Sequence, residues 1–241
     1  MRYLEHFFFP SFRSSLYATC WKAKFQGKLI SAAAGISGVL LGNSFVAVKE
    51  WLTNRSKRQK ETAYLAIIVV SHLDRFANGC LHVALDDGTE DGRPAGRNEE
   101  EYTPTTTPPD FQPLDIDVEW KVLPRDLMYA ILRLPDEKEK VQNTLAGIAE
   151  YDDDYPDHTE YFWARRSAYA ELGLQASRLA TRLRRHGGMP LEQPEPGEWS
   201  RDKELLDVLK EIDDKRDAHR RRLAEKAIKR AADAQTGTEP V

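Results

Sequence analysis

Five residues that could bind a metal lie within a stretch of seven in the second half of the chain. They are Asp152, Asp153, Asp154, Asp157 and His158. Carboxylates this close either raise one another's pKa or gather a cation, which is the chemistry that a metal site or an acid–base enzyme needs. Acidic residues are also favoured ahead of a helix by the helix dipole, and these residues stand in a proline-containing turn before a helical pattern. We therefore expect a solvated turn with no functional metal, unless the fold gathers the side chains into a pocket.

Patterns of common catalytic and cofactor sites are missing from the sequence. There is no phosphate-binding Gly-x-x-x-x-Gly-Lys-Ser/Thr loop, no dinucleotide-binding glycine pattern, no Gly-x-Ser-x-Gly and no His-Glu-x-x-His. The two cysteines, Cys20 and Cys80, match no zinc or disulfide pattern, and Cys80 falls on an apolar helix face, where a core role is expected. We expect a non-catalytic protein without a cofactor.

A basic stripe near the C-terminus is the strongest binding pattern. Between residues 215 and 230 there are eight Lys or Arg and two acidic residues. Five residues recur there at the three-four spacing of one helix face: Lys215, His219, Arg222, Lys226 and Lys229. Such a stripe can lie on the phosphates of nucleic acid or on anionic lipid headgroups. It lacks interleaved aromatics and base-reading residues, so a nucleic-acid partner is not favoured over a solvated charged helix, in which Glu211 pairs with Lys215.

Charge is segregated along the 241 residues, although the net charge is only −4. Residues 1–61 carry a net charge of +7, residues 62–198 carry −12, and residues 199–241 carry +1. Twenty uncharged residues, 29–48, lie inside the basic block, and a helix of that length covers about 30 Å, the thickness of the hydrocarbon layer. Lysines and arginines, together with Trp21, Phe25 and Trp51, flank this run as they flank membrane helices. The sequence predicts a single transmembrane helix at 29–48; a buried core helix or an interfacial segment is the alternative.

The predicted span carries a smooth face made of Ala34, Gly38 and Gly42, which recur every four residues. Two such faces can pack closely in a bilayer, so we expect them to support a homo-oligomer. Basic residues slightly favour the C-terminal side, which places the following domain in the cytoplasm. Residues 1–28 form a basic, aromatic N-terminal segment, and they only weakly resemble an organelle-targeting leader.

The remaining residues predict an all-α architecture. We expect one helical bundle or hairpin domain over 49–188, a disordered acidic loop at 86–113 within it, a Pro-rich linker at 189–198, and a charged C-terminal helix and tail at 199–241. A helix at 62–85 is expected to run on from the membrane segment. Its apolar positions follow the three-four spacing of one buried face: Ala66, Val70, Leu73, Ala77, Cys80 and Ala84.

Three further helices follow in the predicted domain. Pro124 begins a helix to about Leu134, and Pro135 separates it from a second at 136–150. Asp157 and Glu160 form a capping box for the third helix, which Gly187 and Gly188 end. Its apolar stripe has the spacing of a bundle or coiled-coil seam and consists of Phe162, Tyr169, Leu172, Ala176, Leu179 and Leu183.

These patterns predict a membrane-anchored helical interaction or scaffold protein with an unidentified protein partner. The alternative is a peripheral binder of nucleic acid or anionic lipid that uses the basic stripe. A third reading, an enzyme without a recognisable motif, requires an acidic pocket around Asp152 and His158.

Overall fold

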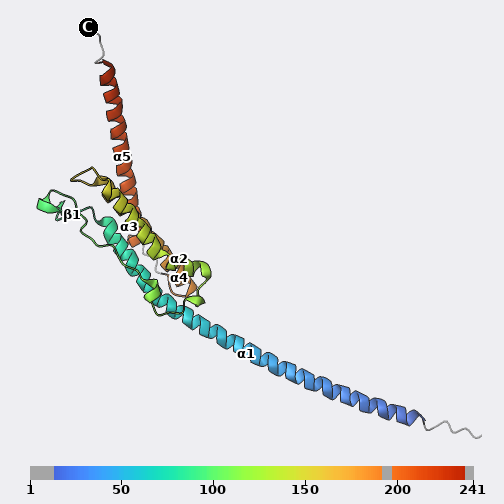
Figure 1. The fold of residues 1–241 in the computed structure, drawn as a ribbon. Coiled ribbons are helices and arrows are strands. Elements are labelled where there is room, and N and C mark those ends of the chain that lie inside the picture. The colour runs from blue at the N-terminus through green and yellow to red at the C-terminus, as the bar shows by residue number, and fades with distance from the viewer. Residues whose placement is uncertain (1–13, 192–196, 237–241) are drawn as a thin grey trace, which may run out of the picture. The chain divides into compact units, whose positions relative to one another are not determined.

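The computed structural model describes the backbone of residues 14–191 and 197–236, and the side chains of residues 45–191 and 197–230. The architecture of this part is all-α, as predicted (Figure 1). The helices are α1 (Ser14–Leu85), α2 (Arg125–Leu132), α3 (Leu134–Glu150), α4 (Thr159–His186) and α5 (Arg201–Thr236). The chain forms two compact units, Met1–Lys57 and Arg58–Val241, and the second holds the hydrophobic core.

The end of α1 and the whole of α4 form the centre of the core. Every position of the two predicted apolar stripes is buried, from Ala66 to Ala84 in α1 and from Phe162 to Leu183 in α4. Helices α2 and α3 contribute Leu127, Ile131, Leu134 and Leu145 to the same cluster. The three-four periodicity therefore predicted correctly which faces pack together.

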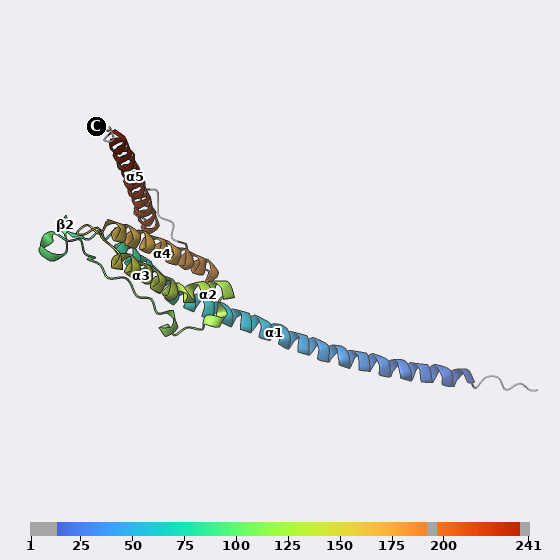
Figure 2. The same cartoon turned by 45° about the horizontal axis from the view of Figure 1, so that its top comes forward.

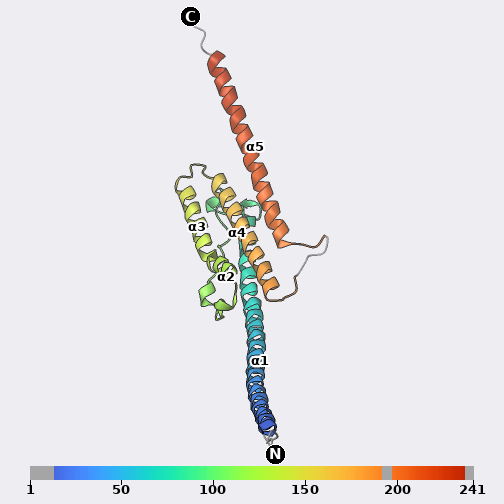
Figure 3. The ribbon, with the colours of Figure 1, turned by 90° about the vertical axis from the view of Figure 1, so that its right-hand side faces the viewer.

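A second apolar cluster attaches α5 to the other side of this pair (Figure 3). Leu205, Val208 and Ile212 pack there against residues of α1 and α4. Gly173 of α4 lies where the three helices meet, because a Cβ on it would stand 3.1 Å from both the Cys80 Cβ and a Leu205 methyl. The prediction of a C-terminal helix apart from the domain is thus wrong over residues 205–212, which belong to its core.

Residues 86–113 are ordered, which corrects the predicted disorder. A small antiparallel hairpin pairs β1 (Thr89–Glu90) with β2 (Arg93–Pro94). Its turn residues Asp91 and Gly92 both have positive φ, 50° and 78°, as a two-residue hairpin turn requires. Further along, Phe111 is buried in the core and its ring lies 5.5 Å from that of Phe76. The segment is held by a few specific contacts rather than by a periodic apolar face.

Short 3₁₀ helices occupy the stretches that join the hairpin to α2. They are η1 (Arg97–Glu99), η2 (Pro113–Asp115) and η3 (Trp120–Val122). The alternating pattern of residues 114–119 predicts a short extended entry, and the structure instead places part of it in η2. Alternation over so few residues does not distinguish a strand from a turn of 3₁₀ helix.

The helix boundaries agree with the sequence at prolines and glycines but not at one cap. Pro135 lies in the first turn of α3, and Gly188, with a φ of 68°, follows the end of α4. The capping box predicted for Asp157 does not form, because Asp154 Oδ2 accepts the hydrogen bond from Thr159 N at 3.2 Å. His158, not Asp157, precedes the helix, with a left-handed φ of 50°.

Within the side chains that the structure describes, no helix combines the length and apolarity needed to cross a membrane. Most of the predicted span, residues 29–44, lies outside those side chains, although its backbone belongs to α1. The described part of α1 from residue 45 to residue 60 is exposed throughout. Large apolar side chains are among the exposed ones: Phe45, Val46, Val48, Trp51 and Leu52.

Candidate functional site

The acidic turn before α4 does not gather into a metal site. Asp153, Asp154 and Asp157 are exposed, and no cluster of metal-ligating side chains occurs among the described residues. Asp152 and His158 form a local pair, with 2.8 Å between Asp152 Oδ2 and His158 Nδ1. Burial raises the pKa of Asp152, and hydrogen bonds from Asp154 N and His158 outweigh it, so the net shift is downward. An enzyme built on an acidic pocket at this turn has no geometric support.

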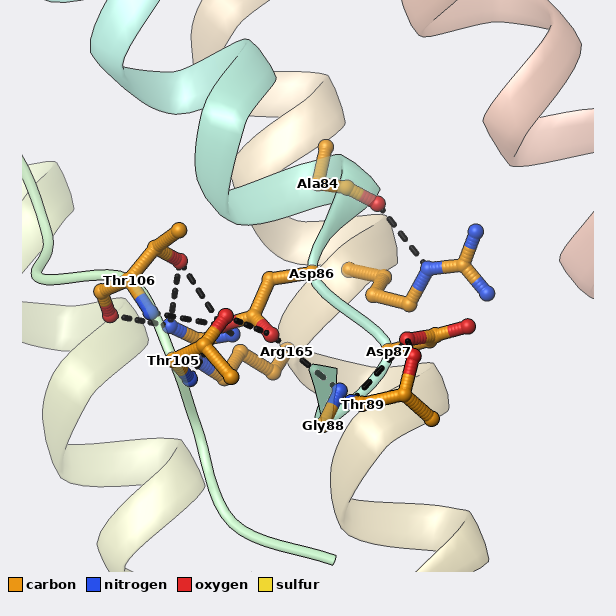
Figure 4. Close-up of polar contacts among 9 residues, drawn as sticks. Ala84, Asp86, Asp87, Gly88, Thr89, Thr105, Thr106 and Arg165 are labelled. Atoms are coloured by element: carbon orange, nitrogen blue, oxygen red, sulfur yellow. Dashed lines mark hydrogen bonds and ion pairs between the residues drawn. The ribbon is translucent and has the colours of Figure 1, made fainter. Parts of the chain in front are cut away.

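A buried polar cluster around Asp86 is the most densely bonded group of the described domain (Figure 4). Asp86 follows directly after α1, and its carboxylate accepts hydrogen bonds from the backbone N–H and hydroxyl groups of both Thr105 and Thr106, at 2.7 to 3.0 Å. Gly88 N donates a further bond of 3.1 Å. Arg165 of α4 completes the cluster through Nη1, which lies 2.7 Å from Asp86 Oδ2. The cluster ties Thr105 and Thr106 to the end of α1 and to α4, two helices of the core.

Hydrogen bonding controls the ionisation of Asp86. Burial alone would raise the pKa of this carboxyl, but the bonds from Thr106, Thr105 and Gly88 outweigh burial and lower it from 3.8 to about 2. Arg165 also donates to the Thr106 carbonyl at 2.7 Å. Since donors from the protein itself contact both oxygens of the carboxylate, the cluster is a structural clamp.

Arg166, the next residue of α4, joins three helices. Its Nε donates to the Ala84 carbonyl in the last turn of α1 at 2.9 Å, and its Nη2 lies 3.3 Å from Glu211 of α5. A cation is favoured at this carbonyl end of α1 by the helix dipole. The two adjacent arginines therefore fix both the segment after α1 and the position of α5.

Contacts between α4 and α5 show that the two helices run antiparallel. Ser177 donates to Asp202 at 2.7 Å, Arg166 lies 3.3 Å from Glu211, and Arg216 lies 3.5 Å from Glu160. The last contact of the series is edge-to-face, between the Trp163 and His219 rings at 5.7 Å. Since α4 begins at Thr159, it offers no further residues to α5 beyond about residue 220.

The predicted basic stripe continues the face by which α5 packs. Leu205, Val208 and Ile212 are followed at the same three-four spacing by the stripe residues. All five of them are exposed: Lys215, His219, Arg222, Lys226 and Lys229. The predicted pair of Lys215 with Glu211 is present. The structure thus places the stripe on a contact face whose first part is already occupied.

We call residues 221–236 the α5 overhang, because they extend past the beginning of α4 (Figure 3). Its described side chains, residues 221–230, are all exposed, including Leu223 and Ile228. They include five basic residues and a single acidic one, Glu225. None of these described basic side chains has an ion-pair partner in the structure. A cationic helix face therefore stands without a protein contact.

An acidic surface lies at the same end of the domain. The segment that follows the hairpin meets the α3–α4 turn there (Figure 2): Tyr102 N donates to the Pro156 carbonyl at 3.1 Å, and Glu101 lies 3.8 Å from His158. We call this surface the acidic end and define it by its exposed carboxylates, which are Asp87, Glu90, Asp91, Glu99, Glu100, Asp153, Asp154, Asp157 and Glu160. Within residues 86–101 and 152–160, which contain these carboxylates, the exposed cations are Arg93 and Arg97. Arg93 is paired with Glu99 at 2.8 Å.

Sequence reasoning finds the basic stripe but misses the Asp86 clamp and the acidic end. The clamp joins Asp86 to a residue 79 positions away, which no local pattern indicates. The Asp-Gly pair at 91–92 is a hairpin signal, and Phe111 is a lone apolar residue in a polar stretch; both could have suggested order. The predicted packing residues Ala34, Gly38 and Gly42 lie outside the described side chains.

Comparison with family models, curated proteins and solved structures finds no match. The class of the protein follows from its fold and surfaces alone: it is an all-α protein whose described domain exposes a basic helix beside an acidic end.

Proposed function

We propose that the protein is a non-catalytic, membrane-anchored interaction protein that displays its helical domain at the membrane surface. The observation that carries the proposal is that the uncharged residues 29–48 and the central core residues 65–84 belong to one helix, α1. A helix that enters a bilayer at one end and a protein core at the other confines the domain to two dimensions. Confinement raises the effective concentration of a second contact without a new interface.

The exposed aromatic residues at the C-terminal edge of the uncharged run support the anchor. Trp51 is 57% exposed and Phe45 is 73% exposed, and both stand at the C-terminal edge of residues 29–48. Aromatic side chains and a collar of cations, such as Lys49 and Arg55, are typical of a membrane–water interface. We propose further that the domain faces the cytoplasm and that Ala34, Gly38 and Gly42 pair two anchors.

Alkaline carbonate washing of membranes from cells that express the full chain tests the anchor. We expect the wild-type chain to stay in the membrane pellet. Leu40→Lys combined with Leu41→Lys should release it, because each lysine at the centre of a span costs about 2.5–3.5 kcal/mol. The matched control is Leu206→Lys with Leu223→Lys, which places two lysines at exposed positions of α5 and should leave the chain in the pellet. Complete release of the wild-type chain would contradict the proposal.

A second candidate is a peripheral binder of anionic polymers, and the exposure of all five stripe residues favours it. Binding of a DNA duplex or of phosphatidylserine vesicles would then fall steeply as salt rises, since phosphate contacts release bound cations. Substitution of Arg222 and Lys226 by glutamine should weaken such binding, and absence of salt-dependent binding would exclude this candidate.

A further inference from the structure

We propose that the α5 overhang binds the acidic end of a second copy of this chain, and that the second copy returns the same contact. This inference rests on the interaction role proposed above and names the partner, but it does not depend on the membrane anchor. The contact would be two-fold symmetric, with each copy contributing one basic helix and one acidic surface.

The overhang continues a helix face that already makes protein contacts. Leu205, Val208 and Ile212 occupy the face in the core, Arg216 meets Glu160, and His219 meets Trp163. The next positions, Arg222, Lys226 and Lys229, have the same spacing but nothing opposite them in the described chain. With sixteen residues, the overhang is about 24 Å long, enough to cross two adjacent helices of about 10 Å diameter.

The overhang and the acidic end of one molecule have complementary charges. The acidic end carries nine exposed carboxylates against two exposed arginines, and the described overhang has the opposite excess. The Arg216–Glu160 pair, at 3.5 Å, shows the type of contact at the point where α5 leaves the domain. Since the described overhang side chains are exposed, a chain does not neutralise its own acidic end with them. A reciprocal pair of chains would neutralise both surfaces.

The charges around the overhang favour a second copy of the chain over nucleic acid or lipid. A polyanion that approaches the overhang also approaches the acidic end beside it, and the juxtaposition of like charges opposes binding. Glu225 within the overhang adds to this repulsion. A second copy meets both surfaces with the opposite charge.

Zero-length carbodiimide coupling of the full chain in detergent tests the contact. Equal amounts of ¹⁴N- and ¹⁵N-labelled protein are mixed, and mass spectrometry selects links that join a light chain to a heavy chain. We expect mixed-isotope links from Lys226 or Lys229 to carboxylates of the acidic end. They should be frequent at 20 mM salt and rare at 500 mM, where exposed charges are screened within a few ångströms.

Charge reversal separates this contact from pairing through the anchor. Arg221→Glu with Arg222→Glu leaves the reporting lysines intact, and Asp153→Arg with Asp157→Arg leaves the glutamates intact. Each double variant alone should lose the links at least about tenfold. Arg221→Glu with Arg222→Glu leaves three basic and three acidic residues in the described overhang, so its net positive charge is gone. Asp153→Arg with Asp157→Arg leaves seven carboxylates against four arginines in the acidic end, so its negative excess falls by more than half. A mixture of the two variants should regain part of the links, since a mixed pair brings one unaltered overhang to one unaltered acidic end. The control is Lys203→Glu with Lys210→Glu, which changes α5 by the same charge at exposed positions outside the overhang.

Two results would overturn the inference: absence of mixed-isotope links between the overhang and the acidic end, or links that neither reversal reduces. Binding of a DNA duplex or anionic vesicles by the overhang in the absence of such links would overturn it as well and assign the surface to that ligand. The carbonate wash of membranes uses the chain without carbodiimide treatment and tests the anchor alone. If the chain stays in the membranes but no links form, the proposed anchor is supported and the contact between copies is not, so the two proposals can fail separately.

Discussion

Replacement of Asp86 by asparagine exchanges one carboxylate oxygen for an NH₂ group, and it should strongly lower the free energy of unfolding of the domain. The side chain of Asp86 is fully buried, and its carboxylate accepts bonds from Gly88, Thr105, Thr106 and Arg165. An asparagine amide retains one acceptor oxygen, but its NH₂ group would face donors, and Arg165 would lose its ion pair. Breaking a buried ion pair by removing one partner costs about 3–5 kcal/mol.

The pKa of Asp86 gives a second measure of the same loss. A shift from 3.8 to about 2 corresponds to about 2.5 kcal/mol of stabilisation of the folded state by the ionised carboxylate. Because the folded pKa is lowered, this stabilisation is complete above pH 4 and disappears as the pH falls through 2. We therefore expect Asp86→Asn to reduce the free energy of unfolding by about 3 kcal/mol at pH 7, and by much less near pH 2.

Urea unfolding of the full chain in detergent, followed by tryptophan fluorescence at pH 7 and pH 2, measures this difference. Hydrogen exchange should also accelerate at the amides of Thr105 and Thr106, which Asp86 binds. The control is Asp87→Asn, because Asp87 is exposed and an asparagine keeps the oxygen that accepts from Thr89 N; its effect should stay within about 0.5 kcal/mol. Equal losses for the two variants, or an Asp86 effect independent of pH, would refute the reasoning.

Further changes test the packing of the domain. Gly88→Ala should lower the free energy of unfolding in urea by about 1–3 kcal/mol, since φ is 81° and the new Cβ would overlap the Phe162 ring. Gly92→Ala is the control, because Gly92 has a similar φ of 78° but open space around it, and its loss should be smaller. Equal losses for the two variants would contradict the close approach of Gly88 to Phe162. Ile212→Ala should lower the free energy of unfolding by about 2–5 kcal/mol and increase hydrogen exchange in α5, because Ile212 is buried. Leu206→Ala, at an exposed position of the same helix, should change both measurements little. If Ile212→Ala leaves the free energy of unfolding unchanged, α5 does not pack at this position. Cys80 is buried, and burial raises the pKa of its thiol to about 12. In a chain with Cys20→Ser, a maleimide should therefore react with Cys80 only after unfolding. Rapid labelling of the folded chain would contradict the burial of Cys80.

Much of the helical core was predictable from local sequence. Apolar residues at three-four spacing identify the faces of α1 and α4, because a helix must bury such a face to be stable. Pro135 and Gly188 mark helix ends through their own backbone preferences, which do not depend on tertiary structure. These signals are local, and the structure agrees with them.

Apart from the Asp-Gly hairpin signal at residues 91–92 and the apolar Phe111, the order of residues 86–113 had no local signal, since it depends on contacts between distant residues. A segment rich in acids, prolines and threonines lacks the apolar surface that normally offsets the entropy of ordering. Here the Asp86–Arg165 pair and the burial of Phe111 supply the compensation. Likewise, the cap of α4 comes from Asp154, although Asp157 has the better spacing to Glu160, because the fold of the turn decides which carboxylate reaches Thr159 N.

The basic stripe was visible in the sequence, but its setting was not. Only the antiparallel contacts of α5 with α4 show that Arg222, Lys226 and Lys229 lie beyond the N-terminal end of α4. The acidic end is assembled from two segments some sixty residues apart, so it has no signature in either segment alone. Surfaces of this kind arise from how elements overlap, and periodicity alone does not indicate overlap.

Thiol accessibility at two positions of α1 tests the membrane anchor most directly. In a chain with Cys20→Ser, Val39→Cys or Thr53→Cys is introduced, and opened membrane fragments are treated with a water-soluble maleimide. We predict rapid labelling at position 53, which is exposed beyond the uncharged run, and labelling at position 39 only after denaturation in SDS, because a thiol in hydrocarbon does not ionise. Equal labelling of the two positions in the membrane fragments would show that residues 29–48 lie in water and would contradict the proposed anchor.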